Sequence, residues 1–149
     1  MAKAKQDLNE IDDDYNESIV EFSEDISEAE APDPLPERDY PATITAVERK
    51  TSAKGNDYLS VMFRIEEEDY PADYDPNNNP GGTQVMHMLG LDDNARVRHR
   101  MRKFCEAIGA PMSRRLNTSE WVGQAAKITI KHDTYEGVTR EKISKVEPA

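Results

Sequence analysis

The chain has 149 residues, one cysteine and a formal net charge of −11. A single cysteine excludes an intramolecular disulfide, which agrees with a reducing cytoplasm. The sequence has neither an apolar run that could span a bilayer nor the apolar core of a signal peptide. We therefore expect a cytoplasmic protein with no membrane contact, of a size that suits one folded domain.

The negative charge lies in the N-terminal quarter. Residues 1–39 contain 14 Asp/Glu against 3 Lys/Arg, which accounts for the whole −11, and the 16 Asp/Glu and 16 Lys/Arg that follow cancel. Repulsion between like charges opposes collapse. We predict that residues 1–36 form a disordered acidic tail and that residues 37–149 form the domain.

One apolar patch, "YNESIVEFSEDI", interrupts the acidic tail. It is either an accidental cluster in a linker or a short docking motif that folds against a partner or against the protein's own domain. Its apolar residues are Tyr15, Ile19, Val20, Phe22 and Ile26.

Two alternating segments follow and predict a β-hairpin. Residues 39–49 place Tyr40, Ala42, Ile44 and Ala46 on one face, and residues 58–67 form the second strand. The intervening "KTSAKGN" supplies the Gly and Asn of a turn. In the second strand, the inward set is Leu59, Val61, Phe63 and Ile65, and the outward set is Tyr58, Ser60, Met62 and Arg64.

Residues 66–82 form a long acidic loop without periodicity, and loops of this length are often functional or mobile. Asp73 and Asp75 lack the spacing of a calcium loop, so we expect no metal site there. A third strand is predicted over residues 83–89.

An amphipathic helix comes next, capped by Asp92 or Asp93 and ended by Gly109. Its apolar stripe predicts that Cys105 is a buried structural thiol. The stripe consists of Val97, Met101, Phe104, Cys105 and Ile108. The helix also carries a basic face, which could follow a phosphate backbone, face solvent, or contact the acidic tail. The basic face consists of Arg96, Arg98, His99, Arg100, Arg102 and Lys103.

The C-terminal part predicts two further strands, over residues 124–132 and 138–146. Trp121 precedes the first of them and is expected in the core or at a hinge rather than on a base-stacking surface. His87, His99 and His132 lack the spacing of zinc ligands.

The predicted order is three strands, a helix and two strands, which is the order of an OB-fold. The expected fold class is therefore all-β with one helix: a five-stranded OB-fold-like Greek-key barrel with the helix between strands three and four. Such barrels bind ligands across strands two and three and at the loops joining strands one to two and four to five. These loops are residues 49–57 and 133–137, and each places cations beside a tyrosine, the combination that single-stranded nucleic acid requires. The predicted DNA-binding residues are Arg49, Lys50, Lys54, Tyr58, Met62, Arg64, Lys131, Tyr135, Arg140 and Lys142.

Three stretches resemble a family of small proteins of tailed bacteriophages, some of which are described as single-stranded DNA-binding proteins. They are "LPERDYPATITAVERKTSAKGNDYLSVMFRI", "RMRKFCEAIGAP" and "WVGQAAKITIKHDTYEGVTREKISKVEP". The resemblance implies that the protein coats single-stranded DNA during phage replication or recombination in the cytoplasm of an infected bacterium. It also implies a replication or recombination protein as a partner of the acidic tail. Proteins of this class usually carry that tail at the C-terminus, whereas this chain ends in "KISKVEPA".

Sequence-tolerant binding of single-stranded DNA is thus the expected function. The alternative is an OB domain that mediates protein interaction or associates with the virion without binding nucleic acid. A metal-dependent nuclease is a third class, to which only the acidic "EEED" points. We expect no enzyme activity, cofactor or bound metal, because the sequence contains no Ser/His/Asp grouping, phosphate loop or nucleotide fingerprint.

Overall fold

The computed structural model describes residues 17–149, and the chain divides into two units, Met1–Ala31 and Pro32–Ala149. In the first unit, residues 17–31 contain one short turn, η2 (Ile26–Glu28), which begins where Asp25 accepts a hydrogen bond from the Ser27 amide at 2.9 Å. Tyr15 and the disorder predicted for residues 1–16 lie outside the described residues. The other apolar residues of the patch, Ile19, Val20, Phe22 and Ile26, are exposed.

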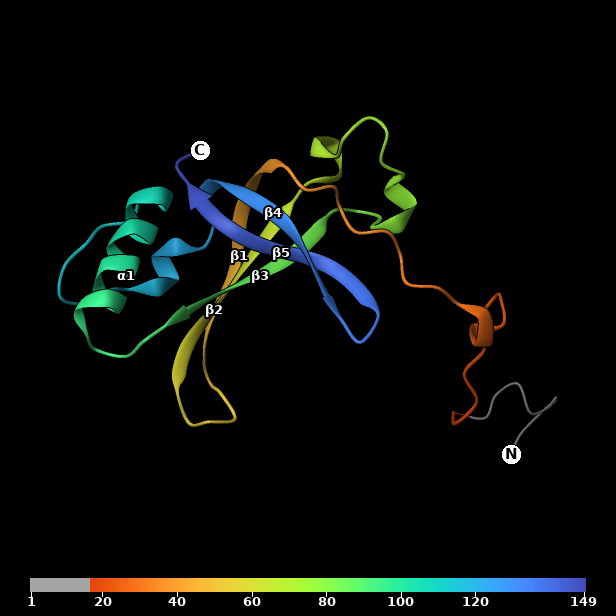
Figure 1. Cartoon of the computed structure of the whole chain (residues 1–149), viewed down its shortest axis with the longest axis horizontal. Coiled ribbons are helices and arrows are strands. Elements are labelled where there is room, and N and C mark those ends of the chain that lie inside the picture. The colour runs from red at the N-terminus through yellow and green to blue at the C-terminus, as the bar shows by residue number, and fades with distance from the viewer. Residues whose placement is uncertain (1–16) are drawn as a thin grey trace. The chain divides into compact units, whose positions relative to one another are not determined.

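The second unit is a five-stranded antiparallel sheet with one helix, as the sequence predicted in its coarse form (Figure 1). The sheet order is β3-β2-β1-β4-β5, so the first strand is central. The elements are β1 (Asp39–Thr51), β2 (Asp57–Ile65), β3 (Thr83–Gly90), α1 (Ala95–Ile108), β4 (Ala125–Tyr135) and β5 (Val138–Glu147).

The sheet does not close into the predicted barrel. Over residues 17–149, no hydrogen-bonded ladder joins β3 to β5, which remain the edge strands. The sheet is nevertheless curved. Its two edge strands approach each other, with Cα atoms of β3 and β5 within 8 Å. Figure 1 shows α1 at the end of the sheet that lies away from the β4–β5 turn.

A bulge in β1 corrects the predicted facing of this strand. The register against β2 shifts between Ile44 and Ala46, so Thr45 is the extra residue. An extra residue reverses the side-chain alternation beyond it. Ala46, predicted to face inward, is therefore exposed, and Val47 packs against the core instead. The same reversal places Arg49 on the inward side of the strand and Lys50 on the outward side.

Aromatic residues join the helix to the sheet. Phe104 of α1 contacts Phe63 of β2 with ring centroids 6.3 Å apart, and it contacts Trp121 at 5.3 Å. Trp121 is only 1% exposed, which confirms its predicted place in the core. Cys105 is buried as predicted, and this burial raises the pKa of its thiol.

The N-terminal cap of α1 differs from the prediction, and the C-terminal residue agrees with it. Asn94, rather than Asp92 or Asp93, caps the N-terminus by accepting a hydrogen bond from the Val97 amide at 2.9 Å. Gly109 ends the helix in the left-handed conformation with φ 72°, as predicted.

The acidic loop 66–82 is built around two tyrosines. Tyr70 and Tyr74 pack edge to face with centroids 5.3 Å apart. The Tyr74 hydroxyl donates to the carbonyl of Asp33 at 2.6 Å, and Tyr70 donates to the carbonyl of Asn79 at 2.7 Å. The loop contains two short turns, η3 (Glu67–Asp69) and η4 (Pro76–Asn78).

The compact unit begins at Pro32, slightly before the predicted boundary at residue 37. Leu35 is fully buried, and its amide donates to a Glu141 carboxylate oxygen at 2.8 Å. Its carbonyl accepts a hydrogen bond from Nε2 of His132 at 2.7 Å. Residues 33–36 are thus attached both to the β4–β5 ladder and to the loop 66–82.

Candidate nucleic-acid interface

The outer face of β2 carries Tyr58, Met62 and Arg64, as the alternation predicts, whereas Ser60 on the same face is only 7% exposed. Lys50 of β1 lies directly opposite Tyr58, and directly opposite residues of an antiparallel pair share a face. The inward positions of β2 are all buried, namely Leu59, Val61, Phe63 and Ile65.

Two methionines of β3 extend this surface and were missed in the sequence. Met86 lies opposite Met62, and Met88 lies opposite Ser60. Their side chains are 42% and 56% exposed. Alternation in "TQVMHMLG" could have identified them, because Val85 and Leu89 are the buried partners in this strand. We call the surface formed by Lys50, Tyr58, Met62, Met86 and Met88 the Tyr58 face.

Arg49 does not belong to the Tyr58 face. It lies opposite Leu59, on the inward side of the ladder, and its guanidinium forms an ion pair with Asp57 at 2.9 Å. The hydrogen bond from Arg49 lowers the pKa of the Asp57 carboxyl, with a further contribution from the hydroxyl of Thr51. Arg49 therefore links the two strands at the end of the β1–β2 hairpin.

The turn of the β1–β2 hairpin presents Lys54 to solvent. The turn closes through hydrogen bonds from the Ser52 amide to the Asn56 carbonyl at 2.8 Å and from the Gly55 amide to the Ser52 carbonyl at 2.9 Å. Gly55 has φ 86°, a conformation that glycine adopts at little cost. Lys54 is exposed, and no carboxylate of residues 17–149 forms an ion pair with it.

Arg64 is engaged within the protein. It forms an ion pair with Glu66 at 3.0 Å and donates to the carbonyl of Gly81. These contacts attach the end of the loop 66–82 to β2. Arg64 thus lies beside the Tyr58 face, with its guanidinium already bound to partners in the chain.

The β4–β5 hairpin holds the remaining predicted residues on its outer face. Lys131 lies opposite Lys142, and Tyr135 is 74% exposed beside the turn at Glu136. Arg140 lies opposite Asp133 without a close ion pair. Within residues 17–149, none of Lys131, Arg140 and Lys142 has a carboxylate oxygen within the 4.0 Å of an ion pair. We call these three residues the hairpin cations.

The basic face of α1 divides into paired and unpaired cations. Arg98 forms an ion pair with Asp93 at 2.5 Å, and Arg102 and Lys103 pair with Glu106 at 3.1 and 3.6 Å. Among the described residues, Arg96 and Arg100 have no such partner.

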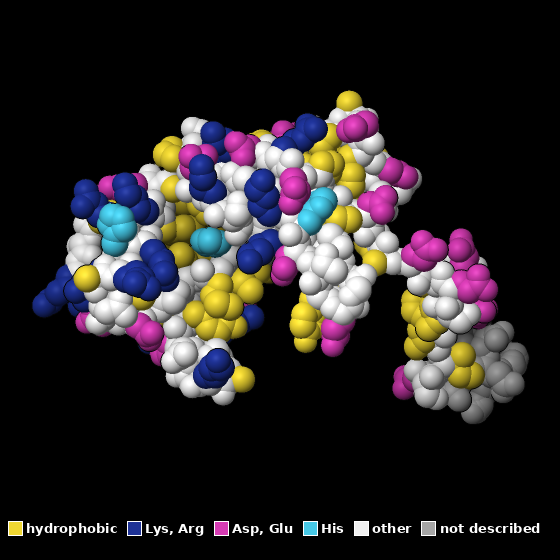
Figure 2. Space-filling view, in the orientation of Figure 1, with side chains coloured by type: hydrophobic (Ala, Val, Ile, Leu, Met, Phe, Trp, Pro, Cys, Tyr) yellow, Lys and Arg dark blue, Asp and Glu magenta, His cyan; other side chains and the backbone are white. Residues whose placement is uncertain are grey.

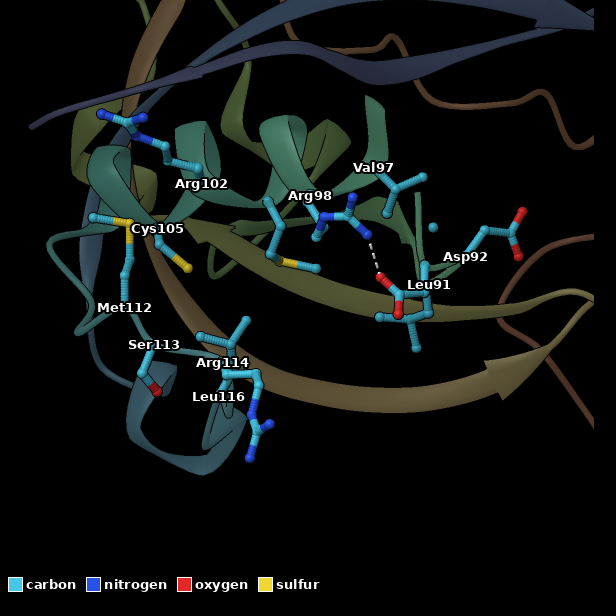
Figure 3. A pocket seen from close by; sticks show the side chains of 13 residues that line it. Leu91, Asp92, Val97, Arg98, Arg102, Cys105, Met112, Ser113, Arg114 and Leu116 are labelled. Atoms are coloured by element: carbon cyan, nitrogen blue, oxygen red, sulfur yellow. Dashed lines mark hydrogen bonds and ion pairs between the residues drawn. The ribbon is translucent and has the colours of Figure 1, made fainter. Parts of the chain in front are cut away.

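A cavity of about 720 Å³ lies between α1 and residues 112–116 (Figure 3). Its walls combine apolar and charged side chains, and Arg98 forms an ion pair with Asp93. Asp92 and Asp93 line the cavity together with three arginines, so its charge is nearly balanced and it favours no anionic ligand. The apolar lining residues are Leu91, Val97, Met101, Met112 and Leu116.

The chemistry of the described residues offers no metal centre, since no group of three or more His, Cys, Asp or Glu within residues 17–149 could hold an ion. None of the described helices has the length and hydropathy that a bilayer span requires. No protein-family model matches the chain, and no curated protein matches it significantly.

Proposed function

We propose that residues 32–149 form an OB-fold domain that binds single-stranded DNA without reading its sequence. The strand order and the position of α1 between β3 and β4 in the chain support this fold, which is a partly open barrel, and the edge strands β3 and β5 approach each other without a ladder between them. In such domains the ligand lies across β2 and β3, between the β1–β2 and β4–β5 turns.

The observation that carries the proposal is the composition of the Tyr58 face. Tyr58 and three partly or largely exposed methionines lie where bases would rest, and Lys50 lies beside them. Aromatic rings stack on bases without sequence preference, and methionine adapts to irregular apolar surfaces.

The two hairpins supply charge for the phosphates. Lys54 at one turn and the hairpin cations at the other are exposed and have no ion-pair partner among the described residues. Neutralising a phosphate with a free cation releases condensed counterions, which favours binding at low salt. Paired arginines such as Arg49 contribute less, because their carboxylate partner must first be displaced.

The biological role that fits this activity is coating of single-stranded DNA in phage replication or recombination. It rests on the resemblance of three stretches of the sequence to the phage proteins, and on the proposed binding itself. The acidic tail would then contact a replication or recombination protein.

Fluorescence anisotropy of the full chain with a labelled oligothymidine tests the binding. We expect the affinity to fall as salt rises, with a log–log slope of about −0.7 per neutralised phosphate. A labelled duplex and an oligonucleotide of mixed sequence are the matched controls. Affinity that is independent of salt, or equal affinity for the duplex, would contradict the proposal.

A protein-interaction domain is the second candidate, and the apolar patch favours it. Ile19, Val20, Phe22 and Ile26 are all exposed within an acidic segment. Such segments commonly bind partners by folding upon them. This candidate predicts that a partner is captured through the patch while the anisotropy of the labelled oligonucleotide does not change.

A further inference from the structure

A groove of about 370 Å³ lies between α1 and the two edge strands β3 and β5. Figure 2 shows Lys and Arg side chains gathered over α1 and along β5, on either side of a hollow with apolar and histidine side chains at its floor. We call it the cationic groove. Its lining residues include Arg100, Lys103, Lys145, His87, Met88 and Phe104.

The rim of the cationic groove carries three cations and no acid. Arg100 has no carboxylate partner among residues 17–149. Lys103 and Lys145 approach Glu106 and Glu147 only at 3.6 and 3.7 Å, in exposed pairs that neutralise little charge. The nearby cavity of Figure 3 differs, because two aspartates line it. The cationic groove therefore suits a ligand that carries more than one negative charge.

The floor offers a flat aromatic surface. The ring of His87 stacks on Phe104 with centroids 5.8 Å apart and an interplanar angle of 13°. Burial lowers the pKa of His87, so the imidazole is neutral at neutral pH. A neutral ring held against a core aromatic can receive a base by stacking.

Met88 connects the cationic groove to the Tyr58 face. It lines the groove, and it also lies opposite Ser60 on the outer side of the β2–β3 ladder. His87 lies opposite the buried Val61, on the inward side of β3, so a strand that crosses β2 and β3 reaches the floor of the groove by passing over the edge of the sheet at Met88.

We infer that the cationic groove continues the path of the single strand beyond β3, with phosphates on Arg100, Lys103 and Lys145 and a base against His87 and Met88. This inference rests on the proposed DNA binding. It also extends the proposed DNA-binding site to α1, where Arg100 and Lys103 of the basic face would contact phosphates. A duplex cannot use the groove in this way, because its bases are already stacked and paired.

A matched pair of variants on one helix tests the inference. Arg100→Ala removes a cation that lines the groove, and Arg96→Ala removes one that is equally free of ion pairs but does not line it. In full-chain titrations with oligothymidine, Arg100→Ala should weaken binding about two- to fivefold at low salt, the scale of an exposed charge contact. The salt slope should also lose about 0.7, the value of one phosphate on a single strand. Arg96→Ala should leave both quantities close to those of the unchanged protein.

Photocrosslinking gives a readout that does not depend on charge. Oligothymidine containing 5-iododeoxyuridine should yield a crosslinked peptide that contains His87 and Met88. Equal losses in the two arginine variants, or crosslinks confined to Tyr58 and Tyr135, would overturn the inference while the proposed DNA binding stands. Failure of the unchanged protein to bind oligothymidine would overturn the proposed function and the inference together.

Discussion

Tyr58 lies directly opposite Lys50 in the β1–β2 ladder, so the phenol ring and the ammonium group share one face of the sheet. Arg49, the preceding residue, points to the other face and is joined to Asp57 at 2.9 Å. These two adjacent cations therefore differ in role. Lys50 lies beside an aromatic ring on the outer surface, and Arg49 links the two strands of the hairpin.

Replacing the two exposed tyrosines should separate binding from stability. Tyr58→Ala and Tyr135→Ala should each weaken single-stranded DNA binding by about 1–3 kcal/mol, the value of one stacked base. Tyr135 is 74% exposed, so the melting temperature of Tyr135→Ala should hardly change. Oligonucleotide titration and thermal unfolding followed by circular dichroism measure the two effects. If Tyr58→Ala lowers the melting temperature and binds normally when folded, then Tyr58 is a packing residue.

Adjacent cations provide a second comparison. Lys50→Gln should weaken DNA binding and reduce its salt slope, because Lys50 shares the Tyr58 face. Arg49→Gln should change the slope less, because Arg49 lies on the opposite face and its hydrogen-bonded pair with Asp57 at 2.9 Å is closer than the exposed pair of Lys50 with Glu48 at 3.6 Å. Titrations at several salt concentrations distinguish the two variants. A larger loss for Arg49→Gln would mean that DNA approaches the opposite face of β1.

The Arg49–Asp57 pair also predicts a pH dependence. Its hydrogen bonds lower the pKa of Asp57 in the folded chain below the ordinary value of 3.8. A lowered carboxyl pKa stabilises the folded state fully above the unfolded value, and this contribution is lost as the pH falls through the folded one. The protection factors of the hairpin amides against hydrogen exchange should therefore fall below about pH 3.8 in the unchanged protein. Asp57→Asn should remove this step, and an identical step in that variant would assign it to another group.

Side-chain periodicity predicted the elements of the folded unit well, because one buried face imposes a strict pattern. The five strands and the helix begin and end within a few residues of the predicted bounds, and Phe63, Phe104 and Trp121 lie in the core as expected. The Thr45 bulge could not be predicted from side-chain alternation, because alternation assumes a ladder without extra residues. The alternation therefore gave the wrong facing for Ala46.

The parts of the site that were missed depend on contacts between distant residues. The attachment of Leu35 to His132 and Glu141 joins positions about a hundred residues apart, and an acidic, proline-rich segment gives no local sign of it. The ion pair of Arg64 with Glu66 could not be predicted either, because the strand pattern places Arg64 on the outward face without indicating a partner. The alternation in β3 predicts that Met86 and Met88 face outward, but methionine is usually assigned to the core.

Removing the central aromatic should destabilise the folded unit. Phe104→Ala deletes the ring that contacts Phe63, His87 and Trp121, and it should cost about 3–5 kcal/mol of unfolding free energy. Urea denaturation measures this cost. Tyr135→Ala serves as the exposed aromatic control, and comparable losses in the two variants would contradict the packing described for α1.

Two glycines at the ends of β3 provide the sharpest test of the backbone beside the Tyr58 face. Gly82 has φ 113°, and an added Cβ would lie 2.9 Å from the carbonyl oxygen of Ile65 and from the Arg64 guanidinium carbon. Gly90 has no positive φ, and an added Cβ would meet no atom within 4 Å. Gly82→Ala should therefore destabilise the protein by about 1–3 kcal/mol through backbone strain alone, and somewhat more through the contact with Ile65. The displacement of Arg64 should also release the loop 66–82, which proteolysis at that loop would detect. Gly90→Ala should leave the unfolding free energy close to that of the unchanged protein. If the two variants unfold at the same urea concentration, the close approach of residue 82 to β2 is wrong.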